Sequence, residues 1–163
     1  QTLYEGGIRV PCLMRWPARL PRGKVVNQPA ITMDLTATFL GAANVAGTLG
    51  VPSADNGTRS VPTTDRQLDG IDLLPILTRA APERERTFCW RVNRSSRKAK
   101  AIRHGDWKYI DDGGVELLIN LKNDIGERRD LGFQRPDVLK DLQSRLKAWE
   151  EEMDRSNPAF VVR

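Results

Sequence analysis

Apolar and polar positions near the start of the chain predict a strand followed by a helix. Residues 8–16 are mostly apolar, with arginines only near the ends of the run, which is typical of a buried strand. A second apolar run, from Leu35 to Ala46, is rich in leucine and alanine and predicts a helix. Asp34 is expected at its N-cap, because a carboxylate there accepts hydrogen bonds from the free amides of the first turn. Gly47 or Gly50 would end this helix.

The pattern then breaks, which indicates where one structural unit ends and the next begins. Residues 51–67 are polar, contain glycine and proline and show little periodicity, so we expect a loop there. Residues 69–77 predict a turn that leads into a short helical segment. Another polar patch, at 80–85, predicts the boundary between two units.

Short apolar stretches separated by turn residues predict an antiparallel sheet in the second part of the chain. Pro136 opens a helix whose apolar residues recur at steps of three and four, which gives one apolar stripe. A four-stranded antiparallel sheet packed on one amphipathic helix is a self-consistent α+β unit. The expected strands are 87–92, 99–103, 107–110 and 116–121, and the stripe consists of Leu139, Leu142, Leu146, Trp149 and Met153.

Composition limits the kinds of function that the chain can have. With 163 residues, of which 39% are hydrophobic and 29% charged, it reads as one folded domain or one and a half. No apolar run approaches the length of a membrane span, and the first residues lack the pattern of a signal peptide. The net charge of +5 suits an anionic partner but does not choose among sulfate esters, nucleic acid and a membrane surface.

Cysteine, histidine and acidic residues form no metal-binding or redox pattern. Cys12 and Cys89 lie far apart, and we expect both to be packed thiols. The single histidine, His104, cannot build a zinc site by itself. The acidic residues between 111 and 130 do not have the spacing of an EF-hand loop, so no calcium site is expected either.

A basic segment at 91–103 is the main candidate for binding an anion. It carries six lysines and arginines and no carboxylate. A loop between two strands would present them to a sulfate or phosphate, whose oxygens match the arginine fork. The segment is equally consistent with a solvated basic loop, while nucleic-acid binding is less favoured, because no aromatic rings alternate with the cations. The candidate substrate-binding residues are Arg91, Arg94, Arg97 and Lys98, and the two other cations are Lys100 and Arg103.

The start of the chain carries the most specific motif. The Gly6–Gly7 pair permits a tight turn or a close backbone approach, and Glu5 and Arg9 can form an ion pair that fixes the turn. Together with Thr2 and Pro11, these residues match the phrase T-x-x-E-G-G-x-R-x-P. This phrase resembles the one that follows the active-site lysine of sulfatases. Residues 16–18 depart from the family's W-P-G only at Ala18.

Four later segments resemble sulfatase motifs in the same order. Residues 34–38 resemble D-L-x-P-T, with Ala37 in place of proline, and 69–75 resemble D-G-x-D-L-x-P. Residues 118–127 resemble L-Y-D-L followed by D-P-x-E, with departures at Ile119, Asn120 and Ile125. The hairpin motif R-x-G-x-W-K matches Arg103, Gly105, Trp107 and Lys108.

The residues of that hairpin motif are expected to have structural roles. Trp107 and Tyr109 alternate with Lys108, so both rings should face the helix stripe while the lysine points away from it. Each of the five motifs is weak alone, but five in the family's order make the resemblance specific, and they span almost the whole chain.

The resemblance implies a fold and a place within it. The parent fold is α/β, as in the alkaline phosphatase superfamily, and residues 1–80 would form the carboxy-terminal end of its large catalytic domain, with one strand and one helix. Residues 81–163 would form the small carboxy-terminal α+β domain, a four-stranded antiparallel sheet packed on a helix.

The resemblance also implies a function, which is the hydrolysis of sulfate esters by a formylglycine residue with the help of calcium. Neither cysteine lies in a C-x-P-S-R motif, and 1–3 contain no lysine, so we expect no catalytic residue and no metal ligand in this chain. It is expected to be inactive alone, and to provide structural support and part of the wall of the substrate pocket.

The expected partners follow from that role. They are the amino-terminal sulfatase domain and a sulfate ester, such as a sulfated glycan, but neither nucleic acid nor a membrane. Self-association is expected where the strand at 8–16 lacks its sheet neighbours. Resemblance suggests a periplasmic or secreted protein. Two alternatives remain open: a stand-alone module that binds polyanions such as sulfated glycans, and a phosphate or phosphonate ester hydrolase of the same superfamily.

Overall fold

The computed structural model describes residues 2–43 and 69–156, which fall into two compact units. The first unit consists of Gln1–Cys12 together with Glu85–Arg163, and the second of Leu13–Arg84. The boundary between Arg84 and Glu85, the second of the two places where the chain passes from one unit to the other, lies in the polar patch predicted at 80–85. The predicted division into a catalytic part, 1–80, and a small domain, 81–163, concerns a parent enzyme and stays a prediction.

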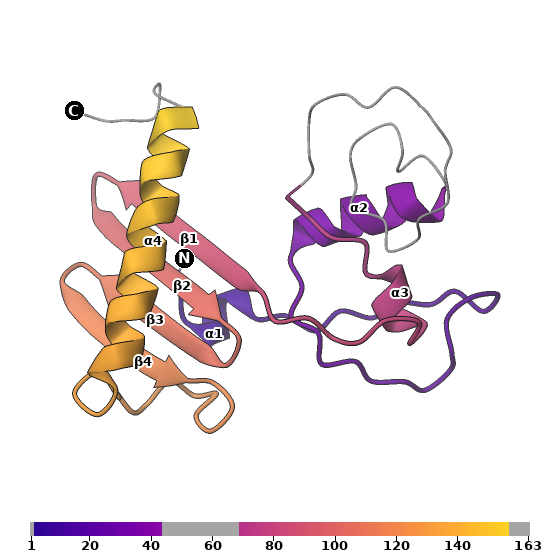
Figure 1. Ribbon diagram of the computed structural model, residues 1–163, viewed down its shortest axis with the longest axis horizontal. Coiled ribbons are helices and arrows are strands. Elements are labelled where there is room, and N and C mark those ends of the chain that lie inside the picture. The colour runs from indigo at the N-terminus through magenta and orange to yellow at the C-terminus, as the bar shows by residue number, and fades with distance from the viewer. Residues whose placement is uncertain (1, 44–68, 157–163) are drawn as a thin grey trace. The chain divides into compact units, whose positions relative to one another are not determined.

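An antiparallel meander forms the centre of the first unit (Figure 1). Its four strands lie side by side in chain order, as the alternation of apolar stretches and turns predicts. The first two strands form a longer hairpin than expected, with their pairing running from Thr87 opposite His104 to Arg94 opposite Arg97. The strands are β1 Thr87–Arg94, β2 Arg97–His104, β3 Trp107–Asp112 and β4 Val115–Asn120.

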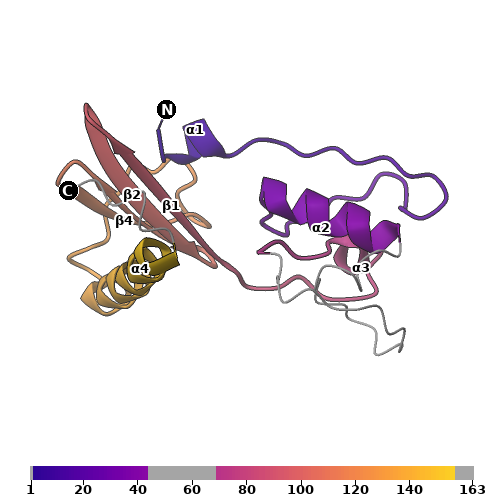
Figure 2. The same ribbon diagram turned by 90° about the horizontal axis from the view of Figure 1, so that it is seen from above.

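Helix α4, Pro136–Ser156, covers one face of this sheet (Figure 2). Leu142 and Leu146 are almost fully buried and pack against Ile102, Tyr109 and Leu118 of three neighbouring strands. Trp107 packs against the same cluster. The predicted α+β unit and the predicted orientation of the two aromatic rings are therefore confirmed.

The start of the chain packs on the opposite face of the sheet, where Figure 2 shows the short helix α1, Glu5–Ile8. Leu3 is buried against Ala99 and Ala101 of β2 and Ile110 of β3. These positions alternate with the ones that face α4, so the sheet has an apolar surface on both sides. The sheet thus lies between α4 and the first residues of the chain.

The strand predicted at 8–16 is not formed. Ile8 ends α1, and residues 9–16 have no strand pairing. Val10 is 77% exposed and Leu13 is 96% exposed, so this apolar run is not buried. A strand needs a neighbour to pair its backbone groups, and the described residues place none beside this segment.

The described residues of the second unit form two helices, α2 Thr32–Ala42 and α3 Leu74–Leu77. Asp34 lies inside the first turn of α2 and not at the predicted N-cap, and its side chain accepts a hydrogen bond from the amide of Ile31. The buried Asp34 carboxylate also accepts a hydrogen bond from the amide of Ile71, and from within the first turn it can therefore join the helix to the turn before α3. The predicted helix ends at Gly47 or Gly50 and the predicted loop 51–67 lie outside the described residues.

Candidate functional site

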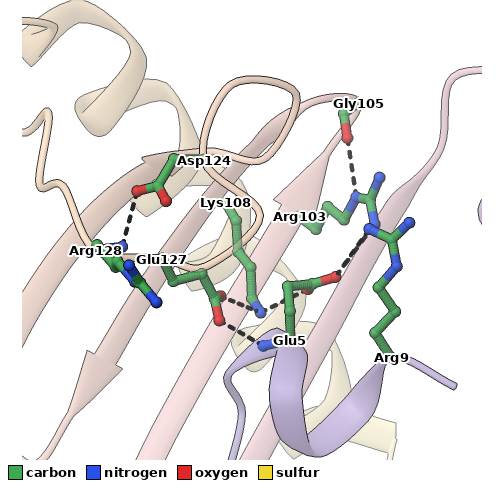
Figure 3. A network of polar contacts seen from close by, with 8 residues as sticks. All are labelled: Glu5, Arg9, Arg103, Gly105, Lys108, Asp124, Glu127 and Arg128. Carbon is green, nitrogen blue, oxygen red and sulfur yellow. Dashed lines mark hydrogen bonds and ion pairs between the residues drawn. The ribbon is translucent and has the colours of Figure 1, made fainter.

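A buried cluster of charged side chains lies between α1 and the sheet (Figure 3). The ammonium of Lys108 is completely buried, and its Nζ donates to Glu5 Oε1 and Glu127 Oε1, each at 2.8 Å. Both carboxylates are almost fully buried as well. A buried charge is stable only when it is paired and hydrogen-bonded, and here each partner satisfies the others.

Three different parts of the fold bring these side chains together. Lys108 points away from α4, as predicted, because its neighbours Trp107 and Tyr109 face the helix. Glu5 begins α1, and its backbone N–H donates to Glu127 Oε2 at 2.5 Å. Glu127 lies in the loop after β4 with a left-handed backbone, φ 53°.

The loop that carries Glu127 is held by its own hydrogen bonds. The carboxylate of Asp124 accepts from the backbone amides of Arg128 and Arg129, each at 2.8 Å. The backbone N–H of Glu127 donates to the carbonyl of Asp124. These bonds fix the turn, so that Glu127 is directed toward Lys108 (Figure 3).

Two arginines balance the charge at the edge of the cluster. Arg9 and Arg103 each lie 3.9 Å from Glu5 Oε2, and Arg103 also donates to the carbonyl of Gly105. The predicted ion pair between Glu5 and Arg9 is present, but Arg9 is mostly exposed and the contact is long. Because each carboxylate is paired with a cation, the cluster is suited to holding these parts of the fold together.

The motif residues found in the sequence divide between this cluster and its surroundings. Trp107 lies on the other face, where Arg135 stacks over its ring at 5.3 Å. A Cβ atom on Gly7 would lie 2.3 Å from Thr2 Oγ1, whereas one on Gly6 would meet nothing within 4 Å. The close approach expected of the glycine pair is therefore specific to Gly7. Members of the predicted motif set that meet in the cluster are Glu5, Arg9, Arg103, Gly105 and Lys108.

The basic segment is a strand hairpin and not a loop, which corrects the prediction. β1 and β2 are joined by a turn at Ser95 and Ser96, and the cations project from both strands. Carboxylates from elsewhere in the sequence meet several of them: Arg91 pairs with Asp154 at 2.7 Å, and Lys100 with Glu150 at 3.0 Å. The sequence window contains no carboxylate, so these partners could not be seen from it.

The four candidate substrate-binding residues lie in different environments. Arg97 binds Asp112 through two of its nitrogens, and Arg91 lies 5.9 Å from the ring of Trp149 as well as beside Asp154. Arg94 and Lys98 are exposed next to the hairpin turn. Their role toward a substrate stays a prediction.

The two cysteines differ, and one prediction about them is wrong. Cys12 is exposed because it lies in the unpaired segment after α1, and so it is not a packed thiol. Cys89 faces α4, and burial together with the nearby Glu150 raises its pKa to about 11. A thiol with that pKa stays protonated at neutral pH and is a poor nucleophile.

Acidic residues of the described chain serve as hydrogen-bond acceptors and ion-pair partners. Asp130 accepts from the amides of Leu118 and Gly132, and Asp111 from the amide of Gly114. Within 2–43 and 69–156, no three histidine, cysteine or acidic side chains are grouped so that they could hold a metal ion. In the same residues, no helix is both long enough and apolar enough to cross a membrane.

Glu127 is the member of the cluster that the sequence analysis did not identify. It was visible as the last letter of the D-P-x-E motif, but its spacing gives no sign of its partner. A usable signal was Lys108 itself: a lysine predicted to point away from the helix, between buried strand positions, needs a carboxylate nearby.

Curated proteins similar to this chain are sulfatases. The chain is 39% identical over 77 residues to N-acetylgalactosamine-6-sulfatase of Canis lupus familiaris, which is 47% of this chain and 12% of that protein. It is 38% identical over 87 residues to steryl-sulfatase of Mus musculus, which is 52% of this chain and 11% of that protein. The chain thus spans only a small part of the length of these relatives. No family model matches it.

Solved structures show the same fold. Ps i-CgsB, crystallised with k-i-k-neocarrahexaose, matches with a TM-score of 0.64 and 24% identity over 82% of this chain and 27% of that one. A 2-O GAG sulfatase matches with a TM-score of 0.50 and 19% identity over 80% of this chain and 26% of that one. Together these matches confirm the resemblance to sulfatases and the predicted α+β architecture.

Proposed function

We propose that this chain forms the carboxy-terminal part of a sulfatase, where it supports the enzyme's fold and contributes to the wall of its substrate pocket. One observation carries the proposal. Glu5, Lys108 and Glu127 come from three separate sulfatase-like motifs and meet in one buried cluster. If the motif matches were accidental, there would be no reason for these side chains to be partners.

The chemistry of sulfate ester hydrolysis would come from outside this chain. Sulfatases use formylglycine as the nucleophile and calcium to neutralise the charge on the sulfate. The described residues do not fit either group: they offer no cluster of metal ligands, and neither cysteine lies in a C-x-P-S-R sequence. We infer that the chain's contribution is structural, together with any contact that its basic hairpin makes to the substrate.

Arg94 and Lys98 are two of the four candidates for such a contact. Both lie beside the β1–β2 turn and are exposed. Arginine and lysine at this position suit the oxygens of a sulfate ester. Replacing Arg94 and Lys98 would then reduce the specificity for a sulfated glycan without abolishing it.

The decisive experiment restores the rest of the enzyme. The chain, alone and joined to an amino-terminal sulfatase part, is assayed with 4-nitrophenyl sulfate and, in parallel, with 4-nitrophenyl phosphate. We expect sulfate hydrolysis by the joined protein and none by the chain alone. A well-folded joined protein that hydrolyses neither ester contradicts the proposal, and one that hydrolyses only the phosphate favours the related hydrolase.

A stand-alone polyanion-binding module is the second candidate, and the basic hairpin and the net charge of +5 favour it. Such a module would be retained on heparin at salt concentrations that remove weak, purely electrostatic binding. The double variant R94A/K98A should then lose retention. Elution at low salt, unchanged by that variant, would exclude this function.

A further inference from the structure

The first described residues pack against a sheet whose strands are far from them in the sequence. Leu3 and Glu5 are each 5% exposed, although they lie at the very start of the chain. Glu5 and its partner Lys108 are separated by 103 positions. Contact ends soon after α1, since Val10 and Leu13 are strongly exposed. The attachment is therefore confined to a short segment, residues 2–9.

This face of the sheet has the features of a specific binding site. Small side chains at Ala99 and Ala101 make room for Leu3, which packs against them and Ile110. Two positions further along the segment, the carboxylate of Glu5 meets the buried ammonium of Lys108. The backbone N–H of Glu5 donates at the same time to Glu127. The site thus recognises an apolar residue, a carboxylate and a main-chain donor within three residues.

Each of these contacts would be costly to leave unmade. Without the segment, the alanine surface would be open to water, and Lys108 would keep only Glu127 as its carboxylate partner. Burial of an unpaired charge is unfavourable, while a charge pair removed from water is little affected by salt. The contacts that hold the segment are therefore those that it makes itself to the sheet and to Glu127.

We propose that the sheet face opposite α4 is a docking site for the segment Thr2–Arg9, with Lys108 as its anchor, and that the segment stays bound when its covalent connection is cut. This inference goes beyond the proposed sulfatase role and does not depend on sulfate chemistry. Its partner is defined by chemistry: a short turn carrying leucine and glutamate in the pattern Leu-x-Glu.

The test uses the full chain with a protease site inserted between Cys12 and Leu13, where the two units divide. The folded protein is cut, passed over a gel-filtration column, and each fraction is analysed by mass spectrometry. We expect the cut segment to co-elute with the rest of the chain, one copy per molecule, and to remain bound at high salt. Release of the segment from the cut, otherwise unchanged protein overturns the inference.

Matched variants identify the anchor. Lys108→Met keeps the length of the side chain without its charge and should release the segment, whereas Lys98→Met, on the exposed end of the same sheet, should not. If Lys108→Met fails to fold, Glu5→Ala decides, because it leaves Lys108 paired with Glu127. Retention of the segment in the Glu5→Ala protein contradicts the proposed recognition. Protection of α4 amides from exchange shows that the sheet is intact in each case.

Discussion

Gly6 and Gly7 are neighbours that differ in how much room they leave for a side chain. At Gly7 a Cβ atom would lie 2.3 Å from Thr2 Oγ1 and 2.9 Å from the Thr2 carbonyl oxygen, while Gly6 faces open space. We expect Gly7→Ala to lower the free energy of unfolding by about 1–3 kcal/mol, because the backbone of α1 must shift. Gly6→Ala should be neutral or slightly stabilising, since alanine favours a helix.

Urea denaturation followed by tryptophan fluorescence compares the two glycine variants. Exchange of the amides of Gly7, Ile8 and Arg9, which donate within the first turn, locates the effect. Equal losses in both variants would show that the approach to Thr2 does not govern this turn.

At the residue scale, the sequence predicted which face of a strand a side chain occupies, but not which side chain it pairs with. Strand alternation correctly oriented Lys108, Trp107 and Tyr109, since neighbouring residues of a strand point to opposite faces. It could not find Glu5 or Glu127 as partners of Lys108, because an ion pair leaves no periodic trace in the sequence. The same limit hid the pairing of Arg91 with Asp154.

Among the elements, periodic patterns were the reliable ones. The four strands and α4 were predicted within a few residues, because the strands are apolar stretches bounded by turn residues and α4 has one apolar stripe. The strand at 8–16 was wrong for a related reason. An apolar run indicates that a segment is more stable when it is buried, but a strand forms only where another strand can pair with it.

Helix α4 depends on its buried leucines. Leu142 is 1% exposed and packs with Ile102, Tyr109 and Leu118. We expect Leu142→Ala to lower the free energy of unfolding by about 2–5 kcal/mol, through lost burial and the cavity that it leaves. Lys140→Ala, at an exposed position of the same helix, should change it by less than about 0.5 kcal/mol. Chemical denaturation measures both, and a small effect at Leu142 would mean that α4 does not complete the core.

At the scale of the whole molecule, the order of the units differs from the order of the chain. The first residues belong with the carboxy-terminal sheet, and Leu13–Arg84 forms a unit between them in sequence. Local patterns place boundaries where polarity changes, as at 80–85, but they do not show which separated segments pack together. The cluster of Glu5, Lys108 and Glu127 and the packing of Leu3 on the sheet reveal this connection.

Exposed apolar residues beyond α1 are the reason that we expect self-association. Val10 is 77% exposed and Leu13 is 96% exposed in a segment with unpaired backbone groups. Such a segment is a template for pairing with another chain. We expect the average mass measured by sedimentation to rise with protein concentration.

Leu13→Asp should weaken that association, because a charge in the segment opposes both apolar contact and close pairing. Ser95→Asp adds the same charge at the exposed turn of the basic hairpin and serves as the control. If association is equal in the two variants, net charge and not the segment is responsible. If the unchanged chain stays monomeric at every concentration, the exposed apolar run is tolerated in water. The prediction that its unpaired backbone drives association would then be wrong.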